Sequence, residues 1–368
     1  MSQSGINMTE ESIRKTLSQI NDPDLGRDIV SLGFVKKIEI AKEKVGVTIE
    51  LTTPACPVKD QMKAQAESLL TELGATEVEV TMTAQVVGQN NPKMRAVLPA
   101  VKNTIAVASG KGGVGKSTVA TNLASALARE GSSVGFLDAD IYGPSAPLMF
   151  GLDGKRPDMY ETSDGDRKLV PLVAHGVKVM SIGFLMDADQ AVIWRGPMAA
   201  GALRQFMTDV DWGDLDYLIF DMPPGTGDIQ LTLSQTIPLT GAVIVTTPQE
   251  LALADARKGL RMFERVQVPV FGIIENMSYF IAPDTGTEYD IFSRGGGKRA
   301  ADELGVPFLG EIPLTIETRK AGDDGMAIVL KQPDSPQADA FMLVARNVAA
   351  AVSTRNMTAE QTQPEIIL

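Results

Sequence analysis

Residues 105–131 read IAVASGKGGVGKSTVATNLASALAREG, and this stretch decides the fold of the chain. It opens on a short apolar run typical of a buried strand, continues in a glycine-rich loop, and ends in a helical pattern that Gly131 can stop. Glycines let the backbone curve around phosphate groups, and the N–H groups at a helix N-terminus converge on them. The order strand, loop, helix therefore predicts a P-loop that binds the phosphates of ATP.

The loop supplies the predicted nucleotide-binding residues. Lys116 is expected to reach the β- and γ-phosphate oxygens, and the hydroxyl of Ser117 is expected to ligate Mg²⁺. The residues predicted to bind ATP in this run are Gly110, Lys111, Gly112, Gly113, Val114, Gly115, Lys116, Ser117 and Thr118.

Three aspartates stand where predicted strands end. Asp138 and Asp140 close the second strand in FLDADIYGPS, and Asp221 closes the third in YLIFDMPPGTGD. Taken singly, such an aspartate is more often a helix cap or a turn residue. Together with a P-loop they predict a catalytic edge, with Asp138 and Asp221 holding Mg²⁺ through water and Asp140 orienting the attacking water.

The sequence that follows the P-loop predicts an α/β fold with a doubly wound parallel sheet. Short runs rich in Val and Ile alternate with helical patterns, which is typical of parallel strands covered on both faces. Ligands of such sheets bind at the carboxyl ends of the strands. The predicted strands are Thr104–Ser109, Ser133–Asp138, Tyr217–Asp221, Ala242–Thr246, Val270–Glu275 and Phe308–Ile312.

A small α+β domain is predicted to precede this P-loop domain. Residues 1–87 contain helical patterns at Thr9–Ile20 and Val58–Leu73 and strand patterns at Phe34–Ile40, Val45–Leu51 and Glu77–Thr83. Residues 88–102 are rich in Gly, Gln, Asn and Pro and are predicted to form a linker. The P-loop domain is predicted over residues 103–356, and a flexible tail over residues 357–368.

Composition narrows the function classes. The formal net charge is -12, which argues against a nucleic-acid partner or an anionic membrane surface, because both are bound through positive charge. The single cysteine, Cys56, allows no intrachain disulfide. Without a run of 18 or more apolar residues, the chain is expected to be cytoplasmic, with no membrane partner.

Lys111 makes the loop unusual, because K-G-G-x-G-K-[ST] resembles the deviant Walker A ATPases that include MinD, ParA and nitrogenase iron protein. This resemblance implies a homodimer in which Lys111 reaches the partner subunit's nucleotide and acts in catalysis with Lys116 and Asp140. The runs LDADIYGPSAP, WRGPM (194–198), DMPPGTGD, TTPQELALADARKG and IENMSYF look like the Mrp/ApbC group of iron–sulfur cluster carrier ATPases. That likeness places Asn276 at the adenine ring.

The N-terminal stretch resembles the small iron–sulfur assembly domain of the SufT and PaaD type. The similarity rests on DPDLGRDIVSLGFV and TTPACPVKDQM. Cys56 is predicted to be the N-cap of a helix that begins at Pro57, where the helix dipole lowers a thiol pKa. From the residues alone, a reactive or iron-binding thiol and a small buried hydrophobe weigh equally. The resemblance favours the functional thiol.

One motif of the Mrp/ApbC group is absent. Its C-P-x-C pair supplies two cysteines per subunit to a bridging [4Fe–4S] cluster, whereas here Ala282 and Thr285 stand at the two positions. Neither can ligate iron, and a homodimer would hold only two thiols, both Cys56. A bound cluster would then need oxygen ligands, a small thiol or a partner's cysteines.

The sequence thus predicts a slow, Mg²⁺-dependent ATPase that carries or assembles iron–sulfur clusters, with apoproteins and assembly factors as partners. The turnover is expected to be slow because no arginine finger or glutamate base can be identified. One alternative is an adapter that uses ATP to change shape and holds no cluster of its own. Another is a positioning ATPase of the MinD or ParA kind.

Overall fold

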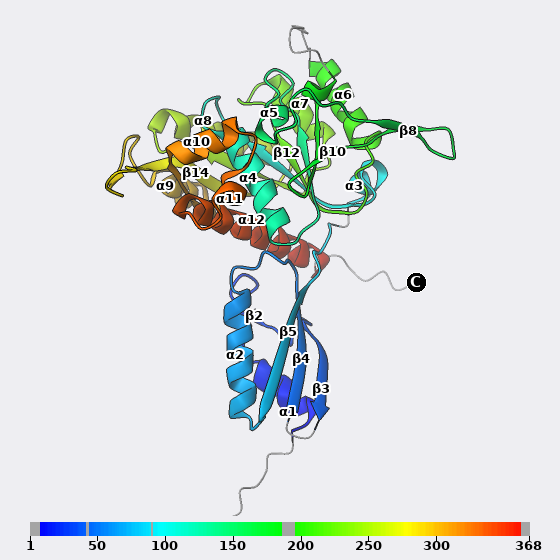
Figure 1. Ribbon diagram of the computed structural model, residues 1–368, viewed down its shortest axis with the longest axis vertical. Helices are drawn as coiled ribbons and strands as arrows, with labels where there is room; N and C mark the ends of the chain where they lie inside the picture. The colour runs from blue at the N-terminus through cyan, green and yellow to red at the C-terminus, as the bar shows by residue number, and fades with distance from the viewer. Residues whose placement is uncertain (1–7, 42–43, 90, 186–195, 362–368) are drawn as a thin grey trace, which may run out of the picture. The chain divides into compact units, whose positions relative to one another are not determined.

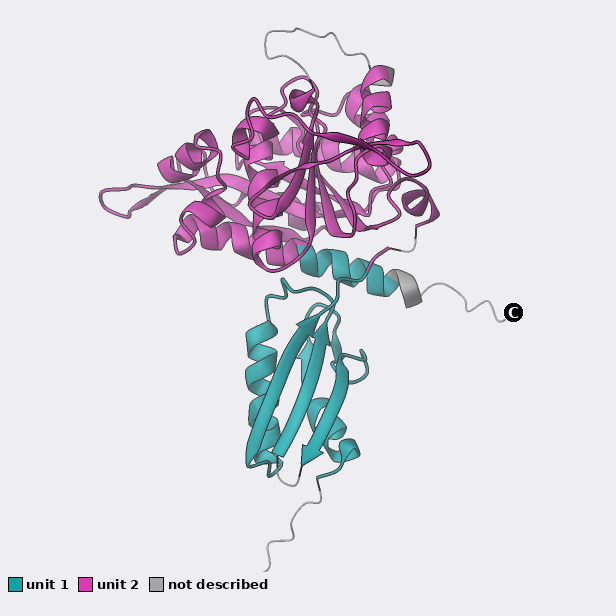
Figure 2. Ribbon diagram, turned by 45° about the vertical axis from the view of Figure 1, so that its right-hand side comes forward, with its two compact units in different colours: residues 1–87, 349–368 teal, residues 88–348 magenta. Residues whose placement is uncertain are grey.

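The computed structural model describes residues 8–41, 44–89, 91–185 and 196–361 (Figure 1). The chain separates into two compact units (Figure 2). The first, unit 1, comprises residues 1–87 and 349–368, and the second, unit 2, comprises residues 88–348.

Unit 1 is built on a three-stranded sheet in the order β3-β4-β5. β3 and β4 pair antiparallel, whereas β4 and β5 run parallel. Alternate residues of β4 are buried, and they pack with the apolar faces of the two helices into one core. The elements are α1 (Glu10–Leu17), β1 (Asn21–Asp22), β2 (Arg27–Asp28), β3 (Val35–Ala41), β4 (Lys44–Leu51), α2 (Lys59–Glu72) and β5 (Glu77–Ala84).

Unit 2 is organised around a long sheet in the order β10-β11-β7-β12-β6-β13-β14-β15, with β16 also paired to β14. The central strands run parallel, and the edge strands β10 and β15 are antiparallel to their neighbours. The strands of the sheet are β6 (Val101–Ala108), β7 (Val134–Asp138), β10 (Leu172–Ala174), β11 (Val177–Ser181), β12 (Leu215–Asp221), β13 (Gly241–Thr246), β14 (Val270–Ile281), β15 (Glu288–Tyr289) and β16 (Phe308–Leu314).

Helices cover both faces of this sheet (Figure 1). α4 packs against β6, β7 and β12, and the buried apolar side chains of these strands form the core beneath it. A separate hairpin, β8 (Met159–Glu161) with β9 (Arg167–Leu169), stands beside the sheet. The helices are α3 (Pro92–Val97), α4 (Lys116–Arg129), α5 (Ala146–Met149), the 3-10 helix η1 (Ile182–Phe184), α6 (Gly196–Thr208), α7 (Asp228–Thr236), α8 (Glu250–Arg265), α9 (Gly296–Leu304), α10 (Ile316–Asp323), α11 (Ile328–Lys331) and α12 (Pro336–Gln361).

The fold class predicted from the sequence is confirmed, and each of the predicted strands is present. Two of the predicted boundaries differ from the structure. The segment 88–102 is not an irregular linker, because Asn91 caps α3, Pro92 occupies its first turn, and β6 begins at Val101. The tail predicted from residue 357 is helical as far as Gln361, since α12 continues through it.

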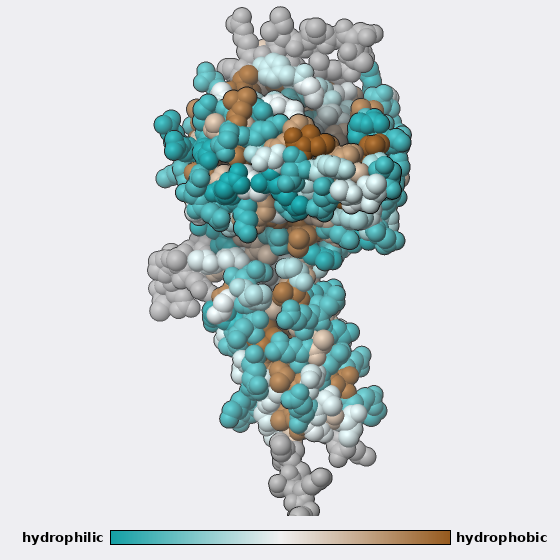
Figure 3. Space-filling model, turned by 90° about the vertical axis from the view of Figure 1, so that its left-hand side faces the viewer, coloured by the Kyte–Doolittle hydropathy of each residue, from teal (hydrophilic) through white to brown (hydrophobic). Residues whose placement is uncertain are grey.

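The face of the molecule shown in Figure 3 is mainly hydrophilic. On the face shown in Figure 3, apolar residues stand singly or in small groups among polar ones. Within the described ranges, no helix is long and apolar enough to cross a membrane.

Candidate functional site

The P-loop connects β6 to α4 at the carboxyl edge of the sheet. Gly113 and Gly115 have φ values of 82° and 78°, in the left-handed region that glycine adopts without steric cost. Gly110 lies so close to α8 that a Cβ there would stand 2.2 Å from the backbone carbonyl of Asp255. Gly113 and Gly115 are therefore required by the backbone conformation of the loop, and Gly110 is required by its packing against α8.

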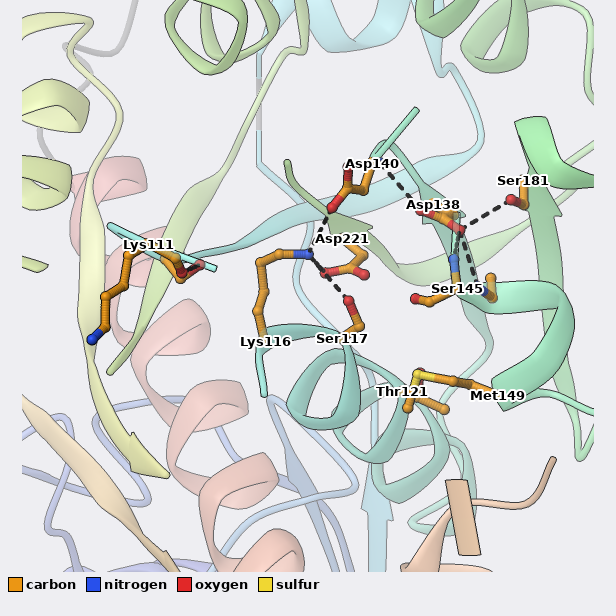
Figure 4. A network of polar contacts seen from close by, with 12 residues as sticks. Lys111, Lys116, Ser117, Thr121, Asp138, Asp140, Ser145, Met149, Ser181 and Asp221 are labelled. Carbon is orange, nitrogen blue, oxygen red and sulfur yellow. Dashed lines mark hydrogen bonds and ion pairs between the residues drawn. The ribbon is translucent and has the colours of Figure 1, made fainter. Parts of the chain in front are cut away.

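Lys116 is the centre of a buried ionic network (Figure 4). Its Nζ lies 2.6 Å from Oδ1 of Asp221 and 3.8 Å from Oδ2 of Asp140, and it donates to Oγ of Ser117 at 3.2 Å. The Lys116 and Asp221 side chains are 6% and 0% exposed. The P-loop lysine and two of the three predicted carboxylates thus meet in one place.

Asp221 has a second oxygen that nothing in the described chain satisfies. Its Oδ2 is buried and has no hydrogen-bond partner, while Oδ1 pairs with Lys116. Buried polar atoms in native proteins normally find a partner. Asp221 and Ser117 present oxygen donors of the kind that Mg²⁺ prefers. These residues therefore fit a Mg²⁺ ion that would hold phosphates near Lys116.

Both carboxylate oxygens of Asp138 accept hydrogen bonds from the protein itself. Its Oδ1 accepts from the backbone N–H of Asp140 at 3.1 Å. Its Oδ2 accepts from the N–H groups of Ser145 and Ala146 and from the hydroxyl of Ser181, each at 3.0 Å. Burial, together with the negative charge of nearby Asp221, raises the pKa of Asp138 to about 7, and the hydrogen bond from the Ala146 N–H opposes this shift. The structure thus shows this carboxyl group held by backbone N–H groups and by Ser181, and its role in holding Mg²⁺ through water stays a prediction.

Asp140 lies at the start of the loop between β7 and α5 and is 9% exposed. Burial raises the pKa of its carboxyl group, and the positive charge of Lys116 opposes that shift. A carboxylate that is partly shielded from water and lies beside the phosphate-binding lysine is suited to orient a water molecule.

Lys111 points away from this network (Figure 4). Its backbone carbonyl accepts a hydrogen bond from the Ser109 hydroxyl at 2.9 Å, which fixes the backbone while the side chain extends outward. Within one chain, Lys111 therefore does not join the Lys116 network.

Asn276 on β14 contacts the P-loop. Its Nδ2 donates to the carbonyl oxygen of Val114 at 2.8 Å, and the residue is 5% exposed. A Cβ on Gly115 would lie 2.3 Å from that same nitrogen. In this structure Asn276 braces the loop, and its role at the adenine ring stays a prediction.

Thr118 lies in the first turn of α4, where its carbonyl oxygen accepts a hydrogen bond from Asn122 Nδ2.

Ala282 and Thr285 lie in the tight turn between β14 and β15. The N–H of Ala282 donates to the carbonyl of Thr287 at 2.9 Å, and the N–H of Gly286 donates to the carbonyl of Ala282 at 2.8 Å. The side chain of Thr285 caps the turn by accepting from the N–H of Thr287 at 3.3 Å. The turn is well hydrogen-bonded without cysteine, and no group of three or more His, Cys, Asp or Glu residues in the described chain is arranged to hold a metal ion.

An ionic cluster joins the strands next to this turn. Arg294 pairs with Glu288 of β15 and Glu311 of β16, and its guanidinium lies 4.0 Å from the centroid of the Tyr279 ring. The paired Arg294 holds the pKa of Glu311 below its usual value. Buried Glu275 accepts from the N–H groups of Gly295 and Gly297, which ties β14 to the start of α9.

The N-cap prediction for Cys56 is wrong. α2 begins at Lys59 with Val58 at the cap position, and the Val58 side chain makes no capping hydrogen bond. Burial raises the pKa of the Cys56 thiol to about 11, and the charges of Asp22 and Asp24 add to the shift. The thiol is therefore protonated at neutral pH, opposite to the activation expected from a helix dipole.

Sequence reasoning missed three polar residues around the site: Ser145, Ser181 and Glu275. Ser145 lies inside the quoted run LDADIYGPSAP, but a serine after proline carries no signal of its own. Ser181 reaches Asp138 from 43 positions away, so only the pairing of β11 with β7 brings them together. The Trp194 part of the quoted WRGPM run lies outside the described residues.

Two family models match the chain. The model described as NUBPL iron-transfer P-loop NTPase matches residues 100–349, and one described as iron-sulfur cluster assembly protein matches residues 10–82. An iron-sulfur cluster carrier protein from Synechocystis is 50% identical over 94% of this chain and 98% of its own length. The iron-sulfur cluster carrier protein from Escherichia coli is 43% identical over 91% of this chain and 90% of its own length.

Solved structures resemble the P-loop unit. A nucleotide-binding protein from Archaeoglobus fulgidus, determined in complex with ADP, is 39% identical with a TM-score of 0.58, over 68% of this chain and 96% of that one. The cell division ATPase MinD from Pyrococcus furiosus shares the fold at 23% identity and a TM-score of 0.50, over 67% of this chain and 98% of that one.

Proposed function

Because this chain belongs to the NUBPL iron-transfer P-loop NTPase family, we propose that it hydrolyses ATP in order to carry or assemble iron–sulfur clusters for apoproteins. The chain is a P-loop NTPase preceded by an iron–sulfur cluster assembly domain. The proposal includes a cytoplasmic homodimer, a state in which Lys111 would reach the nucleotide of the partner subunit.

The buried network around Lys116 carries the proposal. The ammonium group already faces Asp221 at 2.6 Å, at the carboxyl edge of the sheet where phosphates bind. Phosphate oxygens would compete with Asp221 for Lys116, and the N–H groups of the loop would receive the rest of the phosphate charge. When bound at Ser117 and Asp221, Mg²⁺ would neutralise negative charge on the phosphates. Asp140 would orient the attacking water.

The cluster is the cargo in this proposal. Ala282 and Thr285 contribute no thiolate, and each chain has one cysteine. A homodimer would therefore supply two thiols, both from Cys56, to a cluster that normally takes four. The remaining ligands would come from a small thiol, from oxygen donors or from the recipient protein.

Anaerobic reconstitution tests the proposal. The purified chain is incubated with iron, sulfide and glutathione, and its iron and sulfide contents are measured before an apo-acceptor is added with ATP. We expect cluster transfer that depends on ATP and is lost in Lys116→Ala, with Cys56→Ser reporting whether the thiol takes part. Failure of both the chain and its complex with a cysteine donor to hold a cluster would refute the carrier role.

A second candidate function is an ATP-switched adapter that holds no cluster. The hydrogen-bonded turn at Ala282 and Thr285, which is complete without cysteine, favours it. Capture experiments with the wild-type chain in ATP and in ADP would then recover iron–sulfur assembly proteins in one nucleotide state only. Recovery of none in either state would count against the adapter.

A further inference from the structure

The loop between β7 and α5 carries a serine hydroxyl whose place is otherwise unexplained. Ser145 occupies the N-cap position of α5, yet its side chain makes no capping hydrogen bond. Its Oγ is buried and has no partner anywhere in the described ranges. A serine at a helix start normally uses its hydroxyl to cap the helix, so this one is held in place for another reason.

The backbone of Ser145 is fixed by Asp138. The N–H groups of Ser145 and Ala146 both donate to Asp138 Oδ2 at 3.0 Å, and Ser181 Oγ donates to the same oxygen at 3.0 Å. Asp138 is 1% exposed and its Oδ1 also accepts from Asp140 N–H, so the carboxyl group clamps the whole loop. The direction of the Ser145 hydroxyl is therefore set by the strand ends and not by the loop alone.

That direction is toward the nucleotide site. Figure 4 shows the Ser145 side chain pointing to the side of the network where Ser117 and Asp221 lie. Asp221 Oδ2, the other unsatisfied oxygen of this site, is buried there as well. Buried polar atoms in native proteins normally find a partner, so two unsatisfied atoms in one site indicate a ligand that both would contact.

We propose that the Ser145 hydroxyl is a ligand for the terminal phosphate of ATP together with its Mg²⁺, and that it thereby distinguishes ATP from ADP. The proposal rests on the proposed ATP use and adds the residue that senses the third phosphate. A hydroxyl can donate to a phosphate oxygen and also offer a lone pair to Mg²⁺. Because Asp138 clamps Ser145, occupation by ATP would tighten the loop from Asp140 to Ala146, whereas ADP would leave the hydroxyl unpaired.

Nucleotide binding by the full chain tests this role without relying on turnover. The affinities of a non-hydrolysable ATP analogue and of ADP are measured by calorimetry, with Mg²⁺ and with a chelator. Ser145→Ala should weaken the Mg²⁺–ATP analogue about tenfold and ADP by less than about twofold, as expected for the loss of one hydrogen bond to a charged group. Ser145→Thr, which keeps the hydroxyl, should restore much of the difference.

A matched control separates the hydroxyl's ligand role from a general effect of burial. Ser132 also has a buried hydroxyl without a partner, but it precedes β7 at the end of the strand remote from the site. Ser132→Ala should change neither affinity, and thermal unfolding of both nucleotide-free variants shows that they fold. Equal affinity of Ser145→Ala and wild type for the ATP analogue, or an equal loss for ATP analogue and ADP, would overturn the inference.

The two proposals fail in distinguishable ways. In one outcome, Lys116→Ala loses binding of the ATP analogue while Ser145→Ala binds it as tightly as the wild type. That result would refute the Ser145 role and leave the proposed function standing. A selective loss in Ser145→Ala, combined with no cluster transfer by the wild type, would refute the carrier function and leave Ser145 as the sensor of the terminal phosphate.

Discussion

At the scale of single residues, Lys116 already has partners before any nucleotide arrives. Its ammonium is paired with Asp221 and near Asp140, whereas the Lys111 side chain points away from both. We expect Lys116→Ala to abolish ATP binding and to lower the free energy of unfolding by about 3–5 kcal/mol, because it leaves buried carboxylates unpaired. Lys111→Ala should change the free energy of unfolding by less than about 0.5 kcal/mol. Urea unfolding of both nucleotide-free variants measures the contrast, and similar losses would contradict it.

The buried carboxyl group of Asp140 is the proposed orienting group for water. Asp140→Asn keeps the size of the side chain but removes its charge and its ability to accept a proton. We expect ATP affinity to stay within about threefold of the wild type while kcat falls by about 10²–10⁴. Calorimetry and a phosphate-release assay measure the two quantities, and wild-type turnover would remove Asp140 from the reaction.

The Cys56 thiol should be slow to react. Its pKa of about 11 leaves far less thiolate at pH 8 than in an unfolded chain, where the pKa of a free cysteine is about 8.5. We expect iodoacetamide to alkylate Cys56 at least about a hundredfold more slowly in the folded protein than in urea, with a rate that climbs until pH 11. Mass spectrometry over a pH series measures it. A plateau near pH 9 would show an ordinary thiol.

At the scale of elements, the P-loop and α8 are packed backbone to backbone. A Cβ on Gly110 would lie 2.2 Å from the Asp255 carbonyl, whereas one on Gly112 would meet nothing within 4 Å. Gly110→Ala should therefore lower the free energy of unfolding by about 1–3 kcal/mol through overpacking. Gly112→Ala should change it by less than about 0.5 kcal/mol. Thermal unfolding of this pair of variants distinguishes a packing requirement from a general need for loop flexibility.

The sequence predicted those elements whose signal is local. Buried parallel strands such as β6 and β13 are continuous apolar runs, and the P-loop motif carries its own strand and helix. The strands β8 and β9 were not predicted because they are short and their residues are largely exposed. β10 was not predicted because it has only three residues. α3 could have been found, since Asn91 followed by Pro92 is a recognised start of a helix.

In the candidate site, too, the sequence predicted the contacts that have a local signal and not those that depend on strand order. The sequence predicts that Lys116 and Asp221 lie close together, because strand ends of a parallel sheet converge at one edge, and the structure shows their side chains 2.6 Å apart. The clamp on Asp138 was not predicted, because its donors include two backbone N–H groups and a hydroxyl from β11. Such groups have no sequence signature, and their meeting depends on which strand lies next to β7.

At the scale of the whole molecule, the acidic charge bears on the choice between an iron–sulfur role and a positioning role. The net charge of -12 opposes counterion release from DNA or from anionic lipid. We therefore expect no ATP-dependent binding to duplex DNA or to vesicles containing phosphatidylserine at about 0.15 M salt, where the Debye length is about 8 Å. Co-sedimentation in ATP and in ADP measures this. ATP-dependent binding to either would revive the positioning ATPase.

The grouping of residues 349–368 with residues 1–87 has a consequence for synthesis on the ribosome. Asn356 donates to the Val87 carbonyl at 2.9 Å, and Ser353 contacts Thr52, so the first unit to be translated is completed by the last helix. At about 5–20 residues per second, the intervening chain takes roughly 15–50 seconds to emerge. Throughout that interval the N-terminal unit is nascent and incomplete, and it becomes whole only after the entire nucleotide site has been made.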